Sequence, residues 1–177
     1  MQKKEDRRTA MTKRMLKDAL TELLRETDIY HVSIRELCEK ADVNRTTFYK
    51  YYGSQFDLLS EMERDLLQSI ERTLCSQQDF RENIIERVIA YLETDIDFIR
   101  LLLNSNVDPQ FPEKLFSLEP IRRMSGDSRP GLSDSESEYY FCFIQYGAYE
   151  MVHKWVNKEK RESPAQVAAM INRFICG

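Results

Sequence analysis

The sequence predicts an all-α fold, and three observations lead to that prediction. Gly and Pro are scarce, at five residues each among 177. Apolar residues recur at spacings of three, four and seven, which is the period of one face of an α-helix. Residues that cap helices, such as Ser33, Asn44 and Ser133, stand just before several of these periodic runs. We expect about nine helices, and the scarcity of Gly argues against sandwiches and barrels.

Composition and cysteine usage narrow the class of protein. Apolar residues make up 42% of the chain and charged residues 32%, which suits a chain with a core and a solvated surface. No apolar run reaches about 18 residues, and no apolar signal core begins the chain. Four widely spaced cysteines without a C-x-x-C pair predict reduced thiols. We therefore expect a cytoplasmic protein that does not span a membrane.

Motifs of catalysis are missing from the sequence. It has neither of the glycine-rich phosphate loops and no nucleophile elbow. Glu150-x-x-His153 is half of a di-iron carboxylate set, but no second Glu-x-x-His accompanies it. We expect no enzyme activity, no metal and no cofactor.

Charge is unevenly distributed along the chain. Residues 1–53 hold 12 Lys and Arg against 9 Asp and Glu, a net charge of +3. The remaining residues hold 14 against 21, a net charge of −7. A basic segment before an acidic one is compatible with a nucleic-acid-binding domain, and equally with a solvated charged tail.

The first four predicted helices include a helix-turn-helix unit. Periodicity and caps place these helices at about 6–26, 34–41, 45–51 and 54–74. Ser33 and Glu36 form a capping-box pattern before the second helix, and Asn44 is a suitable N-cap for the third. The tight Asp42-Val43 connection joins two short helices, as in a helix-turn-helix. We expect a domain at 1–53 and a second at 54–177.

The stretch from Val32 to Leu59 resembles the DNA-binding segment of TetR/AcrR-type transcriptional regulators. Its Thr47-Phe48-Tyr49, the following aromatic pair and the Ser-x-x-Asp-Leu-Leu run match that family's pattern, and the similarity covers residues 9 to 60. The chain departs from the pattern where Asp42 and Thr46 replace glycines, and where Gln55 replaces a lysine. Its last segments, with Gly147, Trp155 and Ser163-Pro164, look like the dimerising helix pair of the family.

The resemblance implies a TetR-like fold, with a three-helix DNA-binding domain and a helical domain for dimerisation and effector binding. It implies a bacterial repressor that binds a palindromic operator as a homodimer and is released by a small apolar or aromatic effector. An activator, or a regulator whose second domain binds a protein partner or co-repressor, is the alternative. A subgroup resembling activators of dihydroxyacetone kinase genes has a similar run around Cys38.

The resemblance also assigns the DNA contacts. Residues at the start of a recognition helix reach base edges in the major groove, and neighbouring hydroxyls and helix starts reach phosphates. The expected base contacts are Arg45, Thr46, Thr47 and Lys50. The expected phosphate contacts are Ser33, Tyr49, Tyr51 and Gln55. Phe48 and Tyr52 are expected in the core, and Lys3, Lys4, Arg7 and Arg8 in a flexible basic arm.

The second domain is expected to contain at least four helices. They are predicted at 79–104, as one helix or two with a bend near Thr94-Asp95, at 111–124, at 133–158 and from Ser163-Pro164 onwards, with a loop at 125–131. The expected dimer interface consists of Tyr140, Ile144, Gly147, Ala148, Met151, Trp155, Val167, Met170, Ile171 and Phe174. The expected effector pocket consists of Tyr91, Phe98, Phe111, Phe116, Tyr139, Phe143 and Tyr146.

Overall fold

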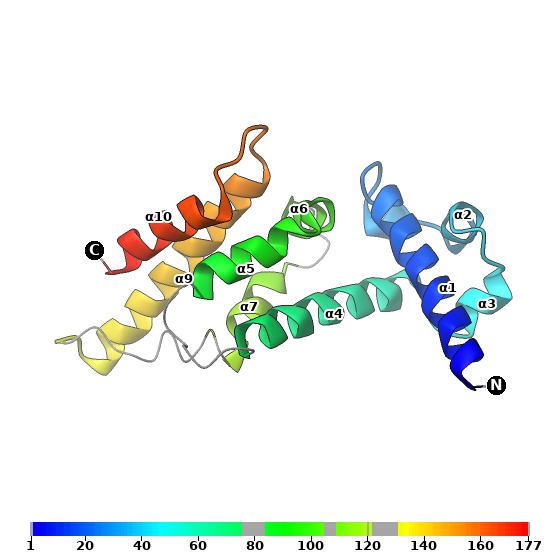
Figure 1. The fold of residues 1–177 in the computed structure, drawn as a ribbon, viewed down its shortest axis with the longest axis horizontal. Helices are drawn as coiled ribbons and strands as arrows, with labels where there is room; N and C mark the ends of the chain where they lie inside the picture. The colour runs from blue at the N-terminus through cyan, green and yellow to red at the C-terminus, as the bar shows by residue number, and fades with distance from the viewer. Residues whose placement is uncertain (1, 76–83, 105–108, 120, 122–130, 177) are drawn as a thin grey trace. The chain divides into compact units, whose positions relative to one another are not determined.

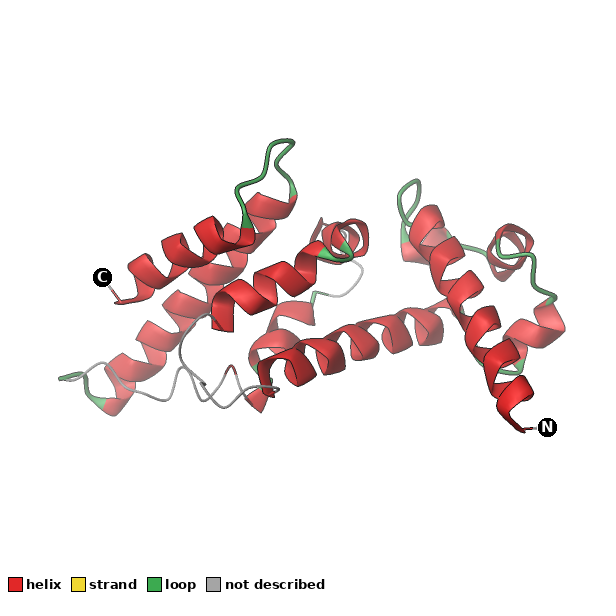
Figure 2. Ribbon diagram, in the orientation of Figure 1, coloured by secondary structure: helices red, strands yellow, loops and turns green. Residues whose placement is uncertain are grey.

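The computed structural model describes residues 2–75, 84–104, 109–119, 121 and 131–176 (Figure 1). These residues form nine α-helices and one short 3-10 helix, without a strand among them (Figure 2). The chain divides into two compact units, which we call the head (Met1–Leu66) and the body (Leu67–Gly177). The all-α prediction is confirmed.

The head contains three complete helices and the first part of a fourth. They are α1 (Gln2–Leu23), the 3-10 helix η1 (Ile29–His31), α2 (Ile34–Lys40), α3 (Arg45–Tyr49) and α4 (Gln55–Cys75). One apolar core joins them, built from Leu16, Leu20, Ile29, Leu37, Phe48 and Leu58, all fully buried. The expected flexible arm is wrong, because α1 already begins at Gln2 and residues 3, 4, 7 and 8 belong to it.

Local capping fixes where these helices begin. The Ser33 hydroxyl accepts a hydrogen bond from the Glu36 backbone N–H, and Glu36 reaches back to the Ser33 N–H. This capping box satisfies donors that a helix start leaves without partners. Asn44 does precede α3, but its side chain makes no capping hydrogen bond. The third helix also ends two residues earlier than predicted, at Tyr49.

The turn between α2 and α3 depends on a left-handed residue. Asp42 has a φ of 51°. Its N–H bonds to the Glu39 carbonyl at 3.3 Å, and the Val43 N–H bonds to the Cys38 carbonyl at 3.0 Å. These two bonds define a Schellman motif, in which glycine is the preferred left-handed residue. Asp42 stands where the TetR-like pattern has that glycine, so the turn keeps its geometry at the cost of backbone strain in a residue with a Cβ.

We expect Asp42→Gly to stabilise the head by about 0.5–1 kcal/mol, because glycine removes the cost of a left-handed Cβ at this position. Urea denaturation followed by circular dichroism measures the change. Asp42→Ala is the control: it retains the Cβ and loses the tolerance of aspartate for this region, so it should destabilise. Equal effects of Gly and Ala would mean that the charge, rather than the backbone, decides stability here.

The body contains α5 (Ile84–Glu93), α6 (Ile96–Asn104), α7 (Phe111–Phe116), α9 (Asp134–Val156) and α10 (Pro164–Cys176). Helix α10 packs along α5 and α9, and α6 packs against α9 (Figure 1). The two-helix alternative for 79–104 is confirmed within its described part, with the break at Thr94-Asp95. The prediction of one helix over 111–124 is wrong, because α7 ends at Phe116 with Ser117 as its C-cap and a turn follows. Most of the predicted loop at 125–131 lies outside the described residues.

Helix α9 begins at a second capping box. Ser133 accepts from the Glu136 N–H and Glu136 accepts from the Ser133 N–H at 2.8 Å. This confirms the predicted cap and satisfies donors at the start of the helix. Cys38, Cys75 and Cys142 carry free thiols. None of the described helices is long and apolar enough to cross a membrane.

Candidate nucleic-acid interface

The start of α3 presents the residues that were predicted to contact bases. Arg45, Thr46 and Lys50 are exposed and Thr47 is half-buried, whereas Phe48 on the opposite side is fully buried. Arg45 also lines a cavity of about 330 Å³ at the α2–α3 turn, together with Arg35, Cys38, Glu39, Asp42, Val43 and Asn44. The polar side chains at the start of α3 are therefore accessible, as contact with the major groove of DNA would require.

The four predicted phosphate contacts have different surroundings. Tyr49 is 58% exposed, and its ring packs edge-on against Phe48 with the ring centroids 5.5 Å apart. Tyr51 is half-buried, and its hydroxyl shares a hydrogen bond of 3.3 Å with Thr9 of α1. The ammonium groups of Lys13 and Lys50 lie over the Tyr51 ring at about 6 Å. Tyr49 is therefore free to reorient at the surface, whereas Tyr51 is held by α1.

Ser33 and Gln55 already have partners within the head. The Ser33 hydroxyl donates to Glu36 Oε2 at 2.7 Å, and the same contact lowers the pKa of the Glu36 carboxyl. The Gln55 amide donates to the Ile29 carbonyl at 3.4 Å. A phosphate at either position has to replace or share these bonds.

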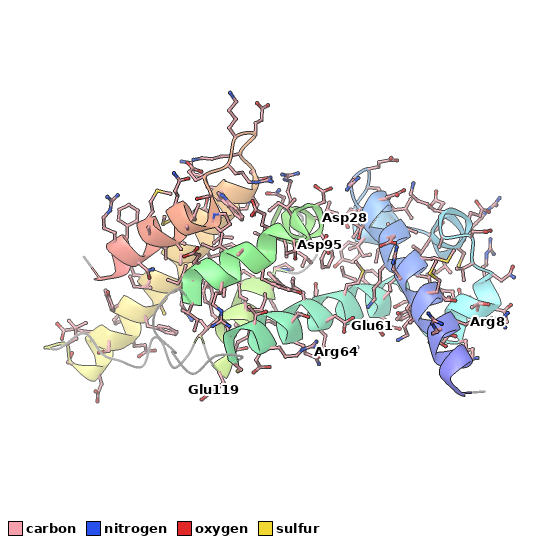
Figure 3. The ribbon with its side chains drawn as sticks, viewed as in Figure 1. Arg8, Asp28, Glu61, Arg64, Asp95 and Glu119 are labelled. Atoms are coloured by element: carbon pink, nitrogen blue, oxygen red, sulfur yellow. The ribbon has the colours of Figure 1, made fainter. Side chains whose placement is uncertain are left out.

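A charged network joins α1, α4 and Tyr52, which follows the last residue of α3 by three positions. Glu61 of α4 accepts from Lys13 at 2.7 Å, from Lys17 at 3.0 Å and from the Tyr52 hydroxyl at 2.9 Å. Lys17 also pairs with Asp65, one turn further along α4. Figure 3 labels Glu61 on α4. This network was not predicted from the sequence, although Lys13/Lys17 and Glu61/Asp65 are matched pairs four residues apart.

The network changes the protonation of two of its members. Burial by itself would raise the pKa of Glu61, but hydrogen bonds from Lys13, Lys17 and Tyr52 outweigh it and lower that pKa to about 2. Burial and the Glu61 carboxylate together raise the pKa of Tyr52. Glu61 therefore stays ionised and Tyr52 stays protonated near neutral pH, which is the combination that the hydrogen bond between them needs.

Cys38 lies beneath the α2–α3 turn and is buried, with 4% of the residue exposed. Burial raises the pKa of its thiol, and the nearby Arg45 guanidinium offsets only part of that effect. The thiol is therefore kept in its neutral form, which packs as a small apolar group rather than acting as a nucleophile.

The seven predicted pocket residues fall into two groups, four of them buried or half-buried and three exposed. Phe98 and Phe111 are buried, and Tyr91 and Phe116 are half-buried. Phe116 packs against Tyr149, which stacks on His153 with nearly parallel rings. Tyr149 was not among the predicted pocket residues, because nothing in the sequence distinguishes it from the other aromatic residues of α9. His153 was noted only for its spacing from Glu150.

The other three predicted pocket residues lie on the outside of the body. Tyr139, Phe143 and Tyr146 are 74%, 74% and 68% exposed, and we call them the aromatic row. Their spacing of four and three places them on one side of α9. Residues on the other side of α9, including Ile144, Ala148 and Trp155, pack toward the body. The row therefore cannot line an internal pocket of a single chain.

The predicted dimer residues also fall into two groups. Trp155, Val167 and Ile171 are 2% exposed, and the Trp155 indole N–H donates to the Glu162 carbonyl at 2.8 Å. Their surfaces are already covered by the chain itself, so they belong to its core rather than to an interface. Gly147 and Phe174 are exposed, whereas Tyr140, Ile144, Ala148, Met151 and Met170 are half-buried.

A cluster of hydrogen bonds joins the ends of α6 and α9. His153 Nε2 lies 2.7 Å from Asn104 Oδ1, and the amides of Asn104 and Asn157 bond to each other at 2.7 and 2.8 Å. The Arg100 guanidinium donates to the Val156 carbonyl at 3.0 Å. His153 thus has a structural role here, and the described residues contain no cluster of three or more His, Cys, Asp or Glu that could hold a metal.

Comparison with known proteins places both units in one family. Residues 16–62 match the model of bacterial regulatory proteins of the tetR family, and residues 81–177 match a transcriptional-regulator C-terminal region. The HTH-type transcriptional regulator YxbF of Bacillus subtilis is 21% identical over 168 residues. That match covers 88% of this chain but only 42% of the relative, so the chain spans less than half of its length.

Solved structures share the fold across nearly the whole chain. A TetR transcriptional regulator from Streptococcus agalactiae has a TM-score of 0.74 at 21% identity, with 99% of both chains covered. The dihydroxyacetone kinase operon activator DhaS has a TM-score of 0.60 at 17% identity, covering 93% of this chain and 94% of its own. NalD, a repressor from Pseudomonas aeruginosa, has a TM-score of 0.51 at 15% identity, covering 99% and 96%.

Proposed function

Because the chain belongs to the TetR family of bacterial transcriptional regulators, we propose that it binds a palindromic DNA operator as a homodimer and controls transcription there. The observation that carries the proposal is the exposed start of α3. Arg45 and Thr46 stand on a recognition helix whose opposite side is anchored by the buried Phe48. An arginine in that position can donate two hydrogen bonds to a guanine edge, and threonine can contact a thymine methyl.

Selection from random duplex DNA, followed by affinity measurement at fixed salt, tests the proposal directly. We expect enrichment of sequences with two-fold symmetry, because each half-site receives one head of the dimer. Recovery of no sequence better than the starting pool contradicts sequence-specific DNA binding. A recovered sequence without symmetry contradicts the homodimer instead.

We expect Arg45→Ala to lose about 1–3 kcal/mol of discrimination at one base pair of each half-site, because a base-edge contact is removed. Tyr49→Phe should instead weaken binding to operator and unrelated duplexes alike, because it removes an expected phosphate contact. Arg14→Ala is the matched control, since Arg14 is exposed on α1 and pairs with Asp18. Equal losses on operator and scrambled DNA for Arg45→Ala would mean that this residue positions the head without reading sequence.

The aromatic row of α9 supports the homodimer. Soluble monomers rarely expose a contiguous apolar patch of this kind unless it is a binding site. Gly147 lies on the same side of α9 as the row, and an added Cβ there would have nothing within 4 Å. Phe174 on α10 is also 60% exposed. We assign the row, Gly147 and Phe174 to a two-fold interface, in which each helix meets its own copy.

We further propose that a small apolar or aromatic effector binds in the body and lowers operator affinity. The internal aromatic groups Phe98, Phe111, Phe116 and Tyr149 support this, and the aromatic row is excluded from the pocket. Helix α4 runs unbroken from Gln55 to Cys75 and has residues in both units. An effector shifts the operator equilibrium only through its different affinities for the two states of the protein.

The effector proposal is tested with a ligand found by thermal-shift screening of the full chain. Operator Kd at fixed salt should rise when that ligand is added. A ligand that stabilises the protein and leaves Kd unchanged contradicts release for that ligand. A fall in Kd would favour the co-repressor or activator alternative.

A further inference from the structure

The recognition helix needs support from outside itself. Helix α3 has five residues, which is too short for its own hydrogen bonds to fix its direction. Two aromatic groups, Phe48 within α3 and Tyr52 just after it, are buried at 0% and 4% exposure. Their rings lie 5.6 Å apart, so they enter the core as a pair. The Tyr52 N–H also bonds to the Phe48 carbonyl at 3.0 Å, so a group that holds Tyr52 also restrains the end of α3.

Glu61 is the residue of α4 that holds Tyr52. Its Oε1 accepts from the Tyr52 hydroxyl and from Lys17, and its Oε2 accepts from Lys13. The Lys13 ammonium in turn lies 5.4 Å from the Tyr52 ring centroid and 6.0 Å from that of Tyr51. One carboxylate of α4 therefore binds α1 and Tyr52, the buried residue just after α3, at the same point.

The charges around Glu61 leave little freedom to rearrange. Two ammonium groups of α1 face two carboxylates of α4, Glu61 and Asp65, and the Glu61 side chain is 16% exposed. Removing one partner from a poorly hydrated pair leaves the other charge without compensation, which costs more than the pair itself contributes. The Lys13 and Lys17 ammonium groups would then repel each other and leave their positions.

We propose that Glu61 is a positioning residue for DNA recognition, which fixes α3 against α1 and α4 so that its side chains meet base edges in register. The proposal rests on the proposed DNA-binding function. It predicts a particular signature, because hydrogen bonds to bases need accurate placement whereas attraction to phosphates does not. Loss of the Glu61 carboxylate should harm discrimination between sequences far more than general DNA affinity.

Asp65→Asn provides a matched control for Glu61→Gln. Both substitutions remove one negative charge from α4 and keep the size of the side chain. Asp65 is 53% exposed and pairs with Lys17. It acts on Tyr52 only through its charge, whereas Glu61 accepts a hydrogen bond from the Tyr52 hydroxyl. A general effect of charge on DNA binding appears in both variants, whereas an effect on the placement of α3 appears only in Glu61→Gln.

The experiment measures the Kd of the full chain for its selected operator and for a scrambled duplex of equal length, at one salt concentration. We define the discrimination ratio as the scrambled-duplex Kd divided by the operator Kd. For Glu61→Gln we expect this ratio to fall at least tenfold, with the scrambled-duplex Kd changed less than threefold. For Asp65→Asn we expect the ratio to change less than threefold. Tyr52→Phe keeps the buried ring and removes the hydroxyl, so it serves if Glu61→Gln folds poorly.

The double variant Tyr52→Phe/Glu61→Gln completes the test. If both residues act through their shared hydrogen bond, the double variant should lose less discrimination than the product of the two single losses. An unchanged ratio in Glu61→Gln and Tyr52→Phe, with normal operator binding by the wild type, overturns the positioning role alone. Equal losses in Glu61→Gln and Asp65→Asn also overturn it. A wild type that does not discriminate between sequences overturns the proposed function as well.

Discussion

Gly147→Glu should convert the proposed homodimer into monomers at micromolar concentration and raise the operator Kd at least a hundredfold. A two-fold axis brings both copies of an interface residue near each other, so one substitution introduces two carboxylates into an apolar contact. An uncompensated buried charge costs several kcal/mol. A single head then retains half of the phosphate and base contacts.

The structure makes this substitution a clean probe of the interface. A Cβ at position 147 meets no atom of its own chain within 4 Å, so the glutamate does not disturb the fold of the body directly. Gly147→Ala is the control, since it improves helix propensity by about 1 kcal/mol without a charge. Sedimentation velocity distinguishes the species. A Gly147→Glu protein that remains a dimer, or a wild type that is monomeric at this concentration, contradicts the interface.

Acid should destabilise the wild-type head by up to about 3 kcal/mol through Glu61 alone. The pKa of this carboxyl falls from 4.5 in its unperturbed state to about 2 in the folded head, and each pKa unit corresponds to about 1.4 kcal/mol. A lowered pKa contributes stability that is fully present above pH 4.5. That contribution is lost as the pH falls toward 2, because the folded state must then take up a proton that the unfolded state already holds.

Glu61→Gln isolates this contribution. Urea denaturation at pH 6 and at pH 3 gives the acid loss for each protein, and the loss should be smaller in the variant. Carboxyls such as Glu36 and Glu136, whose pKa values are also lowered, titrate in both proteins and cancel in the difference. The same acid loss in both proteins would mean that Lys13 and Lys17 find other partners when Glu61 is protonated.

Features that depend on neighbouring residues in the chain were predictable from the sequence. The capping boxes at Ser33 and Ser133 consist of residues three apart, so their pattern marks the starts of α2 and α9 directly. The buried Phe48 and Tyr52 followed from the resemblance of the segment around them. The expected DNA contacts at Arg45, Thr46, Thr47 and Lys50 remain predictions.

Features that depend on choosing between two apolar faces were not predictable. Helix α9 has apolar groups on both sides, with Phe143 and Tyr146 on one and Ile144 and Ala148 on the other. Periodicity identifies such a helix but does not say which side meets its own chain. The aromatic row was therefore predicted to line a pocket, although it is exposed, and Trp155 was predicted to lie in an interface, although it is buried. The Glu61 network was missed because it joins residues up to 48 positions apart.

The unequal burial of the thiols gives the protein its own attachment points for spectroscopic labels. Cys38 is buried in the head and its raised pKa keeps it protonated, so maleimide reagents react there slowly. Cys75 at the end of α4 and Cys142 on α9 are exposed. In a Cys176→Ser background, a fluorophore on Cys142 would sit one residue from the aromatic row. With Cys75 also replaced, the alkylation rate of Cys142 reports the exposure of α9 beside the row. With Cys142 replaced instead, a dye on Cys75 reports changes at the end of α4, without a new cysteine being introduced into the fold.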